Sequence, residues 1–413
     1  MVPCSVPCHR GARRSGWRLT ALLAAVALAA TGCTANANTG SSRTPRVLGA
    51  PKGTPLVLGK PAPSGTGELG ALSCPTVRRC WAVGVASLNP AARPGSTTVI
   101  VATKNGGRTW REQNIAGGGT PQLSGVSCPT PNDCIAVGSD GGSLPGSGVV
   151  LASTNAGATW APVTAPTGAL TVMSVSCSSV SQCLAIVNDG SLIWSATSTD
   201  LGQAWQRQGN LPSLFRAGDD LSCTVGGPCL VAGYVPTGTG TGEGAVALSA
   251  DGGQKWSLAV VPNGVGVLRS ATCSSARACL AAGSTSSSVN NVVRAKGALI
   301  DSADGGHTWQ PVSVAPPVAD VFDIECPSAT VCAMVGTVWK GTPAVGSGAV
   351  AQSGDAGTTF HLSAAAYVPL TLTALSCPST STCFAAGGDS LARVTMAPPQ
   401  PRHHSGSSHG TAT

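Results

Sequence analysis

Short apolar runs alternate with polar, Gly-rich and Pro-rich stretches through most of the 413-residue chain. In one stretch the runs read QLSGVSC (122–128), CIAVGS (134–139), GVVLAS (148–153) and WAPVTA (160–165). Such runs are rich in Val, Ile, Leu or Thr and bounded by Gly, Pro, Asn or Asp, which is typical of β-strands. The pattern predicts units of four antiparallel strands that recur about every fifty residues.

Fourteen cysteines mark the repeat, because they form seven pairs with five residues between the two members. The pairs are Cys74 and Cys80, Cys128 and Cys134, Cys177 and Cys183, Cys223 and Cys229, Cys273 and Cys279, Cys326 and Cys332, and Cys377 and Cys383. Zinc would favour shorter gaps combined into four-ligand sets, whereas an even cysteine set in an exported chain favours disulfide bonds. We expect each bond to close the turn between the first two strands of a unit, which is worth roughly 2 kcal/mol by the loop-entropy model.

A second motif, here called the box, has the form Ser/Thr-x-Asp/Asn-x-Gly-x-x-Trp/Phe and precedes the fourth strand of six units. Its polar and aromatic positions are Asn105, Trp110, Asn155, Trp160, Asp200, Trp205, Asp251, Trp256, Asp304, Trp309, Asp355 and Phe360. The side chain of Asp304 can accept backbone N–H groups of its own turn, and Gly306 supplies the positive φ that the turn requires. We expect Trp309 and its equivalents to fill the gap between neighbouring units.

Radial repetition of four-stranded antiparallel units is the architecture of a β-propeller. The seventh unit begins at residue 372 and ends after its third strand. The apolar run TPLVLG (54–59), which precedes the first strand of the first unit, can supply the missing strand. We therefore predict an all-β, seven-bladed β-propeller over residues 54–397, with a last blade made from both ends and no unprotected edge.

The box resembles the Asp-box, or BNR, repeat of sialidases, sortilin-type receptors, xyloglucan-cleaving hydrolases and the photosystem II assembly-factor type of seven-bladed propeller. Six copies at regular spacing cover essentially all of residues 54–397. The resemblance implies the fold. It does not choose a function, because this repeat serves hydrolases, receptors and assembly factors alike.

The amino-terminal residues read as an export signal, with four arginines before the apolar run LTALLAAVALAA. The Thr-Gly-Cys that follows resembles the bacterial lipobox, which implies removal of residues 1–32 and acylation of Cys33. Ala30 stands where that motif more often has Leu, so ordinary cleavage to a secreted product is the alternative. Residues 33–53 read as a flexible tether and residues 398–413 as a disordered tail.

Charge restricts the class of partner. Loss of residues 1–32 removes four arginines and no acid, which lowers the formal net charge from +7 to +3. No Lys/Arg cluster with interleaved aromatic residues remains, so we expect no nucleic-acid partner. We also expect no cofactor, no metal site, and a monomer that meets the membrane only through a lipid on Cys33.

Chain direction assigns the disulfide-closed turns and the box turns to one face of the ring. The loops on the other face vary from NDGS (188–191) to STSSSVNNVVRAKG (284–297), and variable loops on a rigid frame often form binding sites. Trp339 and Lys340 are candidate binding residues on that face. Packing of Trp339 against a neighbouring loop is the alternative.

Two acids interrupt the small residues expected at the ring axis. Asp220 and Asp323 lie three residues before the first cysteine of their blades, where the other blades have Ala, Gly or Ser. Together with Arg269 they are candidates for a site in which paired carboxylates do acid/base work or hold a cation. The alternative is that the acids are solvated in a wet channel or paired with Arg269.

Tyr234 is a further candidate, because a sialidase uses a Tyr nucleophile with a Glu partner and Glu243 follows in the stretch GYVPTGTGTGEG. The Gly, Thr and Pro residues between them predict a flexible surface instead. We therefore predict a non-enzymatic, lipid-anchored binding or scaffold module for a protein or glycan at the bacterial cell envelope. A cell-envelope glycoside hydrolase is the alternative.

Overall fold

The computed structural model of the chain describes residues 57–58, 66–86, 98–117, 121–140, 146–237, 242–289, 292–312, 318–340, 345–362 and 371–396. These residues form 29 β-strands and no helix. Accordingly, nothing in the described ranges is a helix long and apolar enough to cross a membrane. The predicted signal (1–32), the tether with Cys33 (33–53) and the tail (398–413) lie outside the described residues.

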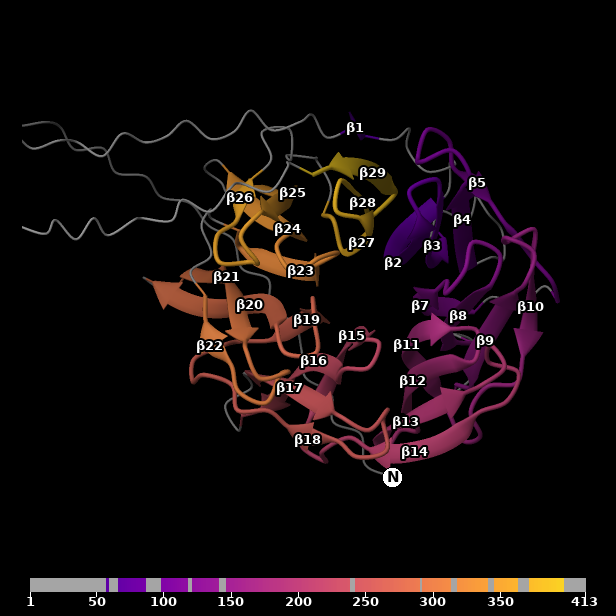
Figure 1. Ribbon diagram of the computed structural model, residues 1–413, viewed down its shortest axis with the longest axis horizontal. Helices are drawn as coiled ribbons and strands as arrows, with labels where there is room; N and C mark the ends of the chain where they lie inside the picture. Colours follow the sequence, from indigo (N-terminus) through magenta and orange to yellow (C-terminus); the bar gives the residue numbers. More distant parts are fainter. Residues whose placement is uncertain are drawn as a thin grey trace, which may run out of the picture. The chain divides into compact units, whose positions relative to one another are not determined.

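Seven sheets of mainly antiparallel strands stand in a ring, and in five of them the strand that comes first in the chain is innermost (Figure 1). Blades one to three are β2 (Thr66–Thr76), β3 (Arg79–Ala86), β4 (Thr98–Thr103) and β5 (Arg111–Glu112); β7 (Gln122–Ser127), β8 (Cys134–Ser139), β9 (Gly148–Ser153) and β10 (Thr159–Val163); and β11 (Thr171–Ser179), β12 (Gln182–Asn188), β13 (Ile193–Ser198) and β14 (Gln206–Asn210). Blades four to six are β15 (Arg216–Cys223), β16 (Cys229–Pro236), β17 (Gly242–Ser249) and β18 (Ser257–Leu258); β19 (Leu268–Cys273), β20 (Cys279–Val289), β21 (Val292–Ser302) and β22 (Gln310–Pro311); and β23 (Asp320–Glu325), β24 (Cys332–Lys340), β25 (Val345–Ser353) and β26 (His361–Leu362). The predicted seven-bladed propeller is confirmed.

The seventh blade joins the two ends of the domain. It contains β27 (Ala374–Ser379), β28 (Thr382–Gly387) and β29 (Ser390–Thr395), and its outer strand is β1 (Val57–Leu58). Val57 pairs with Arg393 and Leu58 with Ala392 in antiparallel register, as predicted for the run 54–59. One detail differs from the prediction. The short strand β6 (Asn114–Ile115) pairs in parallel with β10, so the second blade has a fifth strand.

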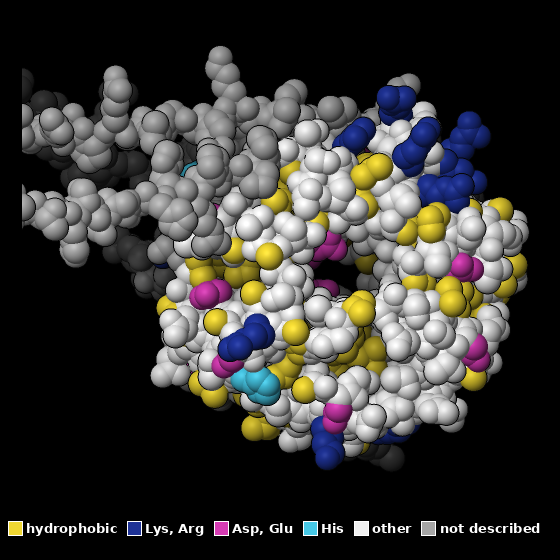
Figure 2. All heavy atoms as spheres, in the orientation of Figure 1, with side chains coloured by type: hydrophobic (Ala, Val, Ile, Leu, Met, Phe, Trp, Pro, Cys, Tyr) yellow, Lys and Arg dark blue, Asp and Glu magenta, His cyan; other side chains and the backbone are white. Residues whose placement is uncertain are grey.

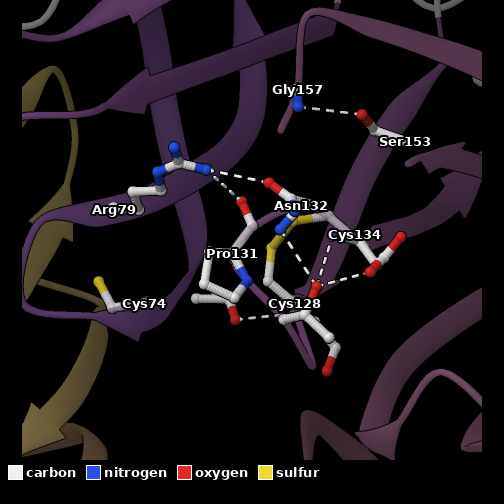
Figure 3. The surroundings of a disulfide bond; sticks show 12 residues. Cys74, Arg79, Cys128, Pro131, Asn132, Cys134, Ser153 and Gly157 are labelled. Carbon is white, nitrogen blue, oxygen red and sulfur yellow. Dashed lines mark hydrogen bonds between the residues drawn. A yellow bond between two sulfur atoms is a disulfide. The ribbon is translucent and has the colours of Figure 1, made fainter. Parts of the chain in front are cut away.

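All fourteen paired cysteines form the seven predicted disulfide bonds. Figure 3 shows the bond between Cys128 and Cys134 and the turn that it closes. That turn also contacts the box of its own blade, because Ala156 N donates to Asn132 O at 2.9 Å. The same contact recurs in the first, third, fifth and sixth blades, so disulfide turns and box turns share one face of the ring.

The box turn is held by its acidic side chain, as predicted. Asp304 Oδ1 accepts from Thr308 N at 3.0 Å, and Thr308 Oγ1 donates to the other carboxylate oxygen at 2.6 Å. Ser302 Oγ donates to Asp304 Oδ1 at 2.7 Å and accepts from Gly306 N at 2.8 Å, and the φ of Gly306 is +91°. The hydrogen bonds from the Thr308 hydroxyl and N–H hold the pKa of Asp304 far below its ordinary value.

The apolar core is divided into seven clusters, each of which lies between two neighbouring blades. Each box aromatic residue packs into the cluster that its blade shares with the preceding blade, as predicted. Trp160, Trp309 and Phe360 are buried there, and Trp110 and Trp205 are partly buried. Burial of side chains this large is a major source of ring stability.

The box glycine also packs against the preceding blade. The residue that it contacts there is the one that follows the second cysteine of that preceding blade. A Cβ on Gly157 would lie 2.3 Å from Trp81 Nε1, and the five other box glycines meet Phe384, Ile135, Leu184, Leu230 and Leu280 in the same way. In the sixth blade the equivalent residue is the small Ala333, which faces the seventh blade, and that blade has no box. Sequence reasoning missed this relation, although the repeat itself displays it.

Candidate functional site

A cavity of about 1100 Å³ lies at the ring axis and is lined by the innermost strands of all seven blades. We call it the central cavity. Figure 2 shows it as an opening in the middle of the disc with Asp and Glu side chains inside it. The charged residues that line it are Glu68, Asp220, Arg269, Asp323 and Glu325. The three predicted site residues nearest the axis, Asp220, Arg269 and Asp323, are thus brought together.

A bulge in the innermost strand sets which side chains face the cavity. The register of β19 jumps from Leu268 to Ser270, and that of β23 jumps from Val321 to Asp323. A bulge bends its strand and re-aims the side chains on either side of it. Six of the seven innermost strands have such a shift, at the same place in each blade.

Asp220 and Asp323 each bond to the next blade around the ring. Asp220 Oδ2 accepts from Ala271 N at 3.0 Å, and Asp323 Oδ2 accepts from Leu375 N at 2.7 Å. The inner edge of an innermost strand has no further strand beside it, so its N–H groups need other acceptors. The two carboxyl groups therefore join neighbouring blades as well as lining the cavity.

A second series of blade-to-blade bonds lies one position before the first cysteine of a blade. In three blades the acceptor is serine, as where Ser73 Oγ accepts from Cys128 N at 3.0 Å. In the sixth blade the acceptor is Glu325, which takes the N–H of Cys377. The position of Glu325 beside the acids was visible in the sequence, but this role was not predicted.

Two of these carboxyl groups have strongly raised pKa values. Burial, and then the negative charge of Asp220, raise the pKa of Asp323 to about 7. Burial, and then the charge of Asp323, raise the pKa of Glu325 to about 8. Three carboxyl groups that affect one another in this way lie within one electrostatic site, so a cation entering the cavity would be attracted to all of them.

Arg269 forms an ion pair with an acid that the sequence did not single out. Its ion pair is with Asp320, where Nε lies 3.2 Å from Oδ1. Its guanidinium also lies over the ring of Phe322, 5.0 Å from the ring centroid. The sequence alternative paired Arg269 with Asp220 or Asp323, whereas the ion pair found here joins Arg269 to Asp320, the first residue of β23.

Tyr234 lines the central cavity, but Glu243 is not its partner. Tyr234 pairs with Gly244 across two strands, whereas Glu243 pairs with Val235. Successive residues of a strand point to opposite faces, so the two side chains lie on opposite sides of the sheet. Both residues belong to paired strands, and residues 238–241 of the stretch between them lie outside the described residues. The arrangement offers no Tyr–Glu couple.

The side chains of the two remaining sequence candidates lie outside the described residues. Trp339 and Lys340 end β24, where they pair with Gly346 and Val345. Within the described ranges, no group of three or more His, Cys, Asp or Glu side chains is arranged to hold a metal ion.

A basic hollow on the first blade was missed in the sequence. It measures about 630 Å³ and is lined by Arg78, Arg79 and Lys104 together with Pro131 and Asn132 of the next blade. Arg79 Nη1 donates to Pro131 O at 2.9 Å and to Asn132 Oδ1 at 3.1 Å (Figure 3). Figure 2 shows Lys and Arg side chains gathered at this edge. Arg78 and Arg79 belong to the disulfide turn of the first blade and Lys104 to its box turn, and the fold brings these two turns together. A search for basic residues that are neighbours in the sequence does not find such a cluster.

No protein-family model matches the chain, and no curated protein matches it. Among solved structures, it is similar to YCF48 bound to D1 peptide, with a TM-score of 0.58 and 15% identity over 83% of this chain and 96% of that one. It is also similar to YCF48 from Cyanidioschyzon merolae, with a TM-score of 0.53 and 13% identity over 82% and 98% of the two chains. A third similar structure is the GH74 xyloglucanase from Xanthomonas campestris, with a TM-score of 0.50 and 13% identity over 77% of this chain and 50% of the enzyme. At these identities the similarity establishes the β-propeller fold and not a function.

Proposed function

We propose that this protein is an exported, lipid-anchored binding module without enzymatic activity, and that it holds a segment of a protein or glycan at the central cavity. Pockets with a few convergent polar groups on a rigid frame are the usual ligand sites of globular proteins. The cavity volume of about 1100 Å³ is enough for a side chain or a short chain segment.

The observation that carries this proposal is the use of the cavity carboxyl groups as acceptors between blades. Asp220, Asp323 and Glu325 each accept a main-chain N–H of the following blade. A general acid or base must exchange its proton with the substrate, which requires a carboxyl group aimed at the reacting atom. Groups held in this way are better suited to fixing the cavity wall and its charge.

The YCF48 structure supports a protein ligand, because that propeller is bound to a peptide. To test binding, the full chain is applied to peptide and glycan arrays beside Asp220→Asn and Tyr234→Ala. We expect bound ligands whose signal falls at least tenfold in both variants and is unchanged in Asp301→Asn, an exposed acid outside the cavity. Ligands that bind all four proteins equally would refute the central cavity as the site.

Export is supported by the seven disulfide bonds, which persist in oxidising compartments. The lipid anchor at Cys33 is tested by metabolic labelling of cells with an alkyne fatty acid. We expect the label on the full chain and its loss in Cys33→Ser. An unlabelled wild-type protein in the medium would indicate ordinary cleavage instead.

A cell-envelope glycoside hydrolase is the second candidate. It is favoured by Glu325, because a carboxyl group with a pKa of about 8 is protonated at neutral pH, as a general acid must be. A screen on fluorogenic glycosides with Asp220→Asn, Asp323→Asn and Glu325→Gln decides between the two functions. We expect no turnover, and turnover by the wild type that these variants lose would refute the binding-only function.

A further inference from the structure

Positive charge is concentrated on the first blade. Five of the twelve Lys and Arg side chains that the structure describes belong to this blade, namely Arg78, Arg79, Lys104, Arg108 and Arg111, whereas the described part of the second blade has none. Figure 2 shows Lys and Arg side chains gathered over this edge of the disc. We call Arg78, Arg79, Lys104 and Arg108, which lie on the disulfide turn and the box turn, the basic surface.

The two turns that carry the basic surface differ from their equivalents in the other blades. The first box contains Lys104 and Arg108 and has Asn105 at the acidic position, so it is the one box of six with a net positive charge. Asn105 Oδ1 still accepts from Thr109 N at 3.0 Å, which keeps the turn without its negative charge. The first disulfide turn, PTVRR (75–79), is likewise the one of seven with two arginines.

The fold leaves these charges unneutralised. Between described residues, ion pairs form at Arg207 and Arg269, and neither pair includes a cation of the basic surface. Arg78, Lys104 and Arg108 are exposed. Exposed cations that serve no internal contact are free to meet an external anion.

A further cation reaches the same place from the seventh blade. A Cβ on Gly106, in the box turn of the first blade, would lie 3.7 Å from Arg393 Nη1 and 3.0 Å from Val77 O. Arg393 Nε is buried and has no hydrogen-bond partner. The guanidinium of Arg393 therefore lies beside the box turn and extends the positive charge toward the seventh blade.

The chain enters the propeller at the same face and in that neighbouring blade. β29 ends at the disulfide turn of the seventh blade, where Met396 N donates to Ser381 O at 3.0 Å. Because β1 is antiparallel to β29, Val57 begins β1 at this end of the blade. The predicted anchor, Cys33, precedes Val57 by 24 residues, which limits their separation to at most about 80 Å.

We propose that the basic surface docks the propeller on an anionic membrane surface, where it contacts the phosphate groups of phospholipids. This inference rests on the proposed lipid anchor and adds a second membrane contact to it. An anchor that enters at the same face presents the basic surface to the headgroups at a high effective concentration. Val77, 38% exposed and in the same disulfide turn, offers an apolar contact between the cations.

The distribution of charge favours several headgroups over one bound phosphate. The cations lie on two separate turns and most of them are exposed, which suits an extended anionic surface. The box acids of blades three to six share this face, so we expect the propeller to rest on its basic edge rather than flat. The face with the variable loops would then be turned away from the membrane.

The direct test is flotation of vesicles with the full chain carrying Cys33→Ser, which lacks the acylation site. Vesicles of phosphatidylcholine with about 30% phosphatidylglycerol are compared with phosphatidylcholine alone. We expect the protein to prefer the anionic vesicles, and to lose this preference as the salt concentration rises to about 0.5 M. No preference for the anionic vesicles would overturn the proposal.

A triple variant locates the contact. Each Lys or Arg near an anionic surface raises partition roughly fivefold, so Arg78→Gln, Lys104→Gln and Arg108→Gln together should weaken binding at least tenfold. Arg79 is left unchanged because it bonds to the second blade. Residues 1–32 are the same in every protein compared, so the difference reports on the basic surface. Thermal unfolding checks that each variant is folded.

The matched control removes the same charge from blades four and five. Arg216→Gln, Lys255→Gln and Arg277→Gln together should leave the affinity for anionic vesicles within about twofold of the unsubstituted protein. An equal loss in the two triple variants would show that net charge alone sets the binding, and would overturn the basic surface as the contact.

Photo-crosslinking of the wild-type chain in membranes provides a readout that holds for the anchored protein. Phosphatidylglycerol with a diazirine on its headgroup should label residues 75–79 and 103–111 and leave 224–228 and 249–256, the equivalent turns of the fourth blade, unlabelled. Labelling of both pairs of turns alike, or of the fourth blade alone, would overturn the proposed orientation.

Two soluble probes separate the membrane from other anions. Inorganic phosphate at about 10 mM and an octapeptide of Glu are each tested for binding in place of vesicles. Binding of either one that the first triple variant loses, without vesicle binding, would assign the basic surface to a soluble anion or an acidic protein and overturn the proposal. Vesicle binding is measured without the lipid, so its failure is distinct from an unlabelled Cys33, which would refute the anchor.

Discussion

The ring has two sets of carboxyl groups, those of the box turns and those of the central cavity. Their pKa values are shifted in opposite directions, and hydrogen bonding alone does not explain the difference. The box acids Asp200, Asp251, Asp304 and Asp355 lie in solvent-facing turns, where donors from their own turn lower their pKa values. The cavity acids Asp323 and Glu325 also accept N–H groups, yet burial and neighbouring negative charges raise their pKa values. The box acids therefore stabilise the fold in the ionised form. The fold disfavours ionisation of the cavity acids, and strongly perturbed pKa values of this kind cluster at functional sites.

Substitutions in the box turn should lower the free energy of unfolding more than substitutions in the cavity wall. The largest loss is expected for Gly157→Ala. A methyl group there would lie 2.3 Å from Trp81 Nε1 at a φ of +75°. Left-handed strain and overpacking together predict a loss of about 2–5 kcal/mol in the free energy of unfolding, measured by urea titration with the disulfide bonds intact. Gly168→Ala is the control, because Gly168 has a φ of +82° and open space around it. Equal losses in the two variants would mean that the contact between blades contributes nothing.

The second prediction concerns a box acid. Asp355→Ala removes an acceptor of Thr359 N at 2.9 Å and should cost about 1 kcal/mol, after allowance for solvent screening. Because folding lowers the pKa of Asp355, its contribution is present above the unfolded value near 4 and is lost as the pH falls. The difference between wild type and variant should thus shrink below about pH 4 in thermal unfolding. Asp355→Asn should lose much less, since Asn105 and Asn155 occupy the same position in other boxes.

The cavity acids should show the opposite pH dependence. Folding raises the pKa of Glu325 to about 8, so its contribution is fully present below the unfolded pKa near 4 and is lost as the pH rises through about 8. Glu325→Gln keeps an acceptor for Cys377 N and removes the charge. It should therefore flatten the decline in stability between pH 5 and 8, by on the order of 1 kcal/mol at pH 8. The exposed Glu243→Gln should leave the decline as it is, and an unchanged slope in Glu325→Gln would contradict the raised pKa.

The smallest change in the free energy of unfolding is expected for a substitution in the wall of the central cavity, Ser174→Ala. Ser174→Ala removes an unbonded hydroxyl, so the free energy of unfolding should change by less than about 0.5 kcal/mol or rise slightly. Ser270→Ala removes two hydrogen bonds between blades and should cost about 1–2 kcal/mol. Urea titration of the two variants compares them directly. A comparable loss in Ser174→Ala would mean that its hydroxyl is bonded in the folded protein.

The fold could be predicted from the sequence because its determinants are local and repeated. Each cysteine pair closes a turn within one hairpin, and each box shapes a turn of eight residues, so their spacing alone counts the blades. Ring closure by residues 54–59 followed from the missing strand of the last unit. The sequence also shows that a large residue follows the second cysteine wherever the next blade has a box, and that the small Ala333 stands there where the next blade has none. This correlation links successive repeats, so it is found only when neighbouring units are compared.

The candidate site could be predicted only in part, because it depends on bulges and on contacts between blades. Comparison of the repeats identified Asp220 and Asp323 as departures at the axis. The partner of Arg269, the opposite orientation of Tyr234 and Glu243, and the unbonded Ser174 all depend on strand register, and a shift of one residue reverses which side a residue faces. The basic hollow around Arg79 likewise depends on two turns that meet only in the ring.

The central claim, that the cavity acids serve a ligand while the box acids serve the fold, is tested most directly by one binding measurement. The affinity for an array ligand that binds the wild type is measured for Asp323→Asn and Asp355→Asn under identical conditions. The account predicts at least a tenfold loss of affinity in Asp323→Asn and no change in Asp355→Asn. Equal affinity in both variants, or a loss confined to Asp355→Asn, would contradict it.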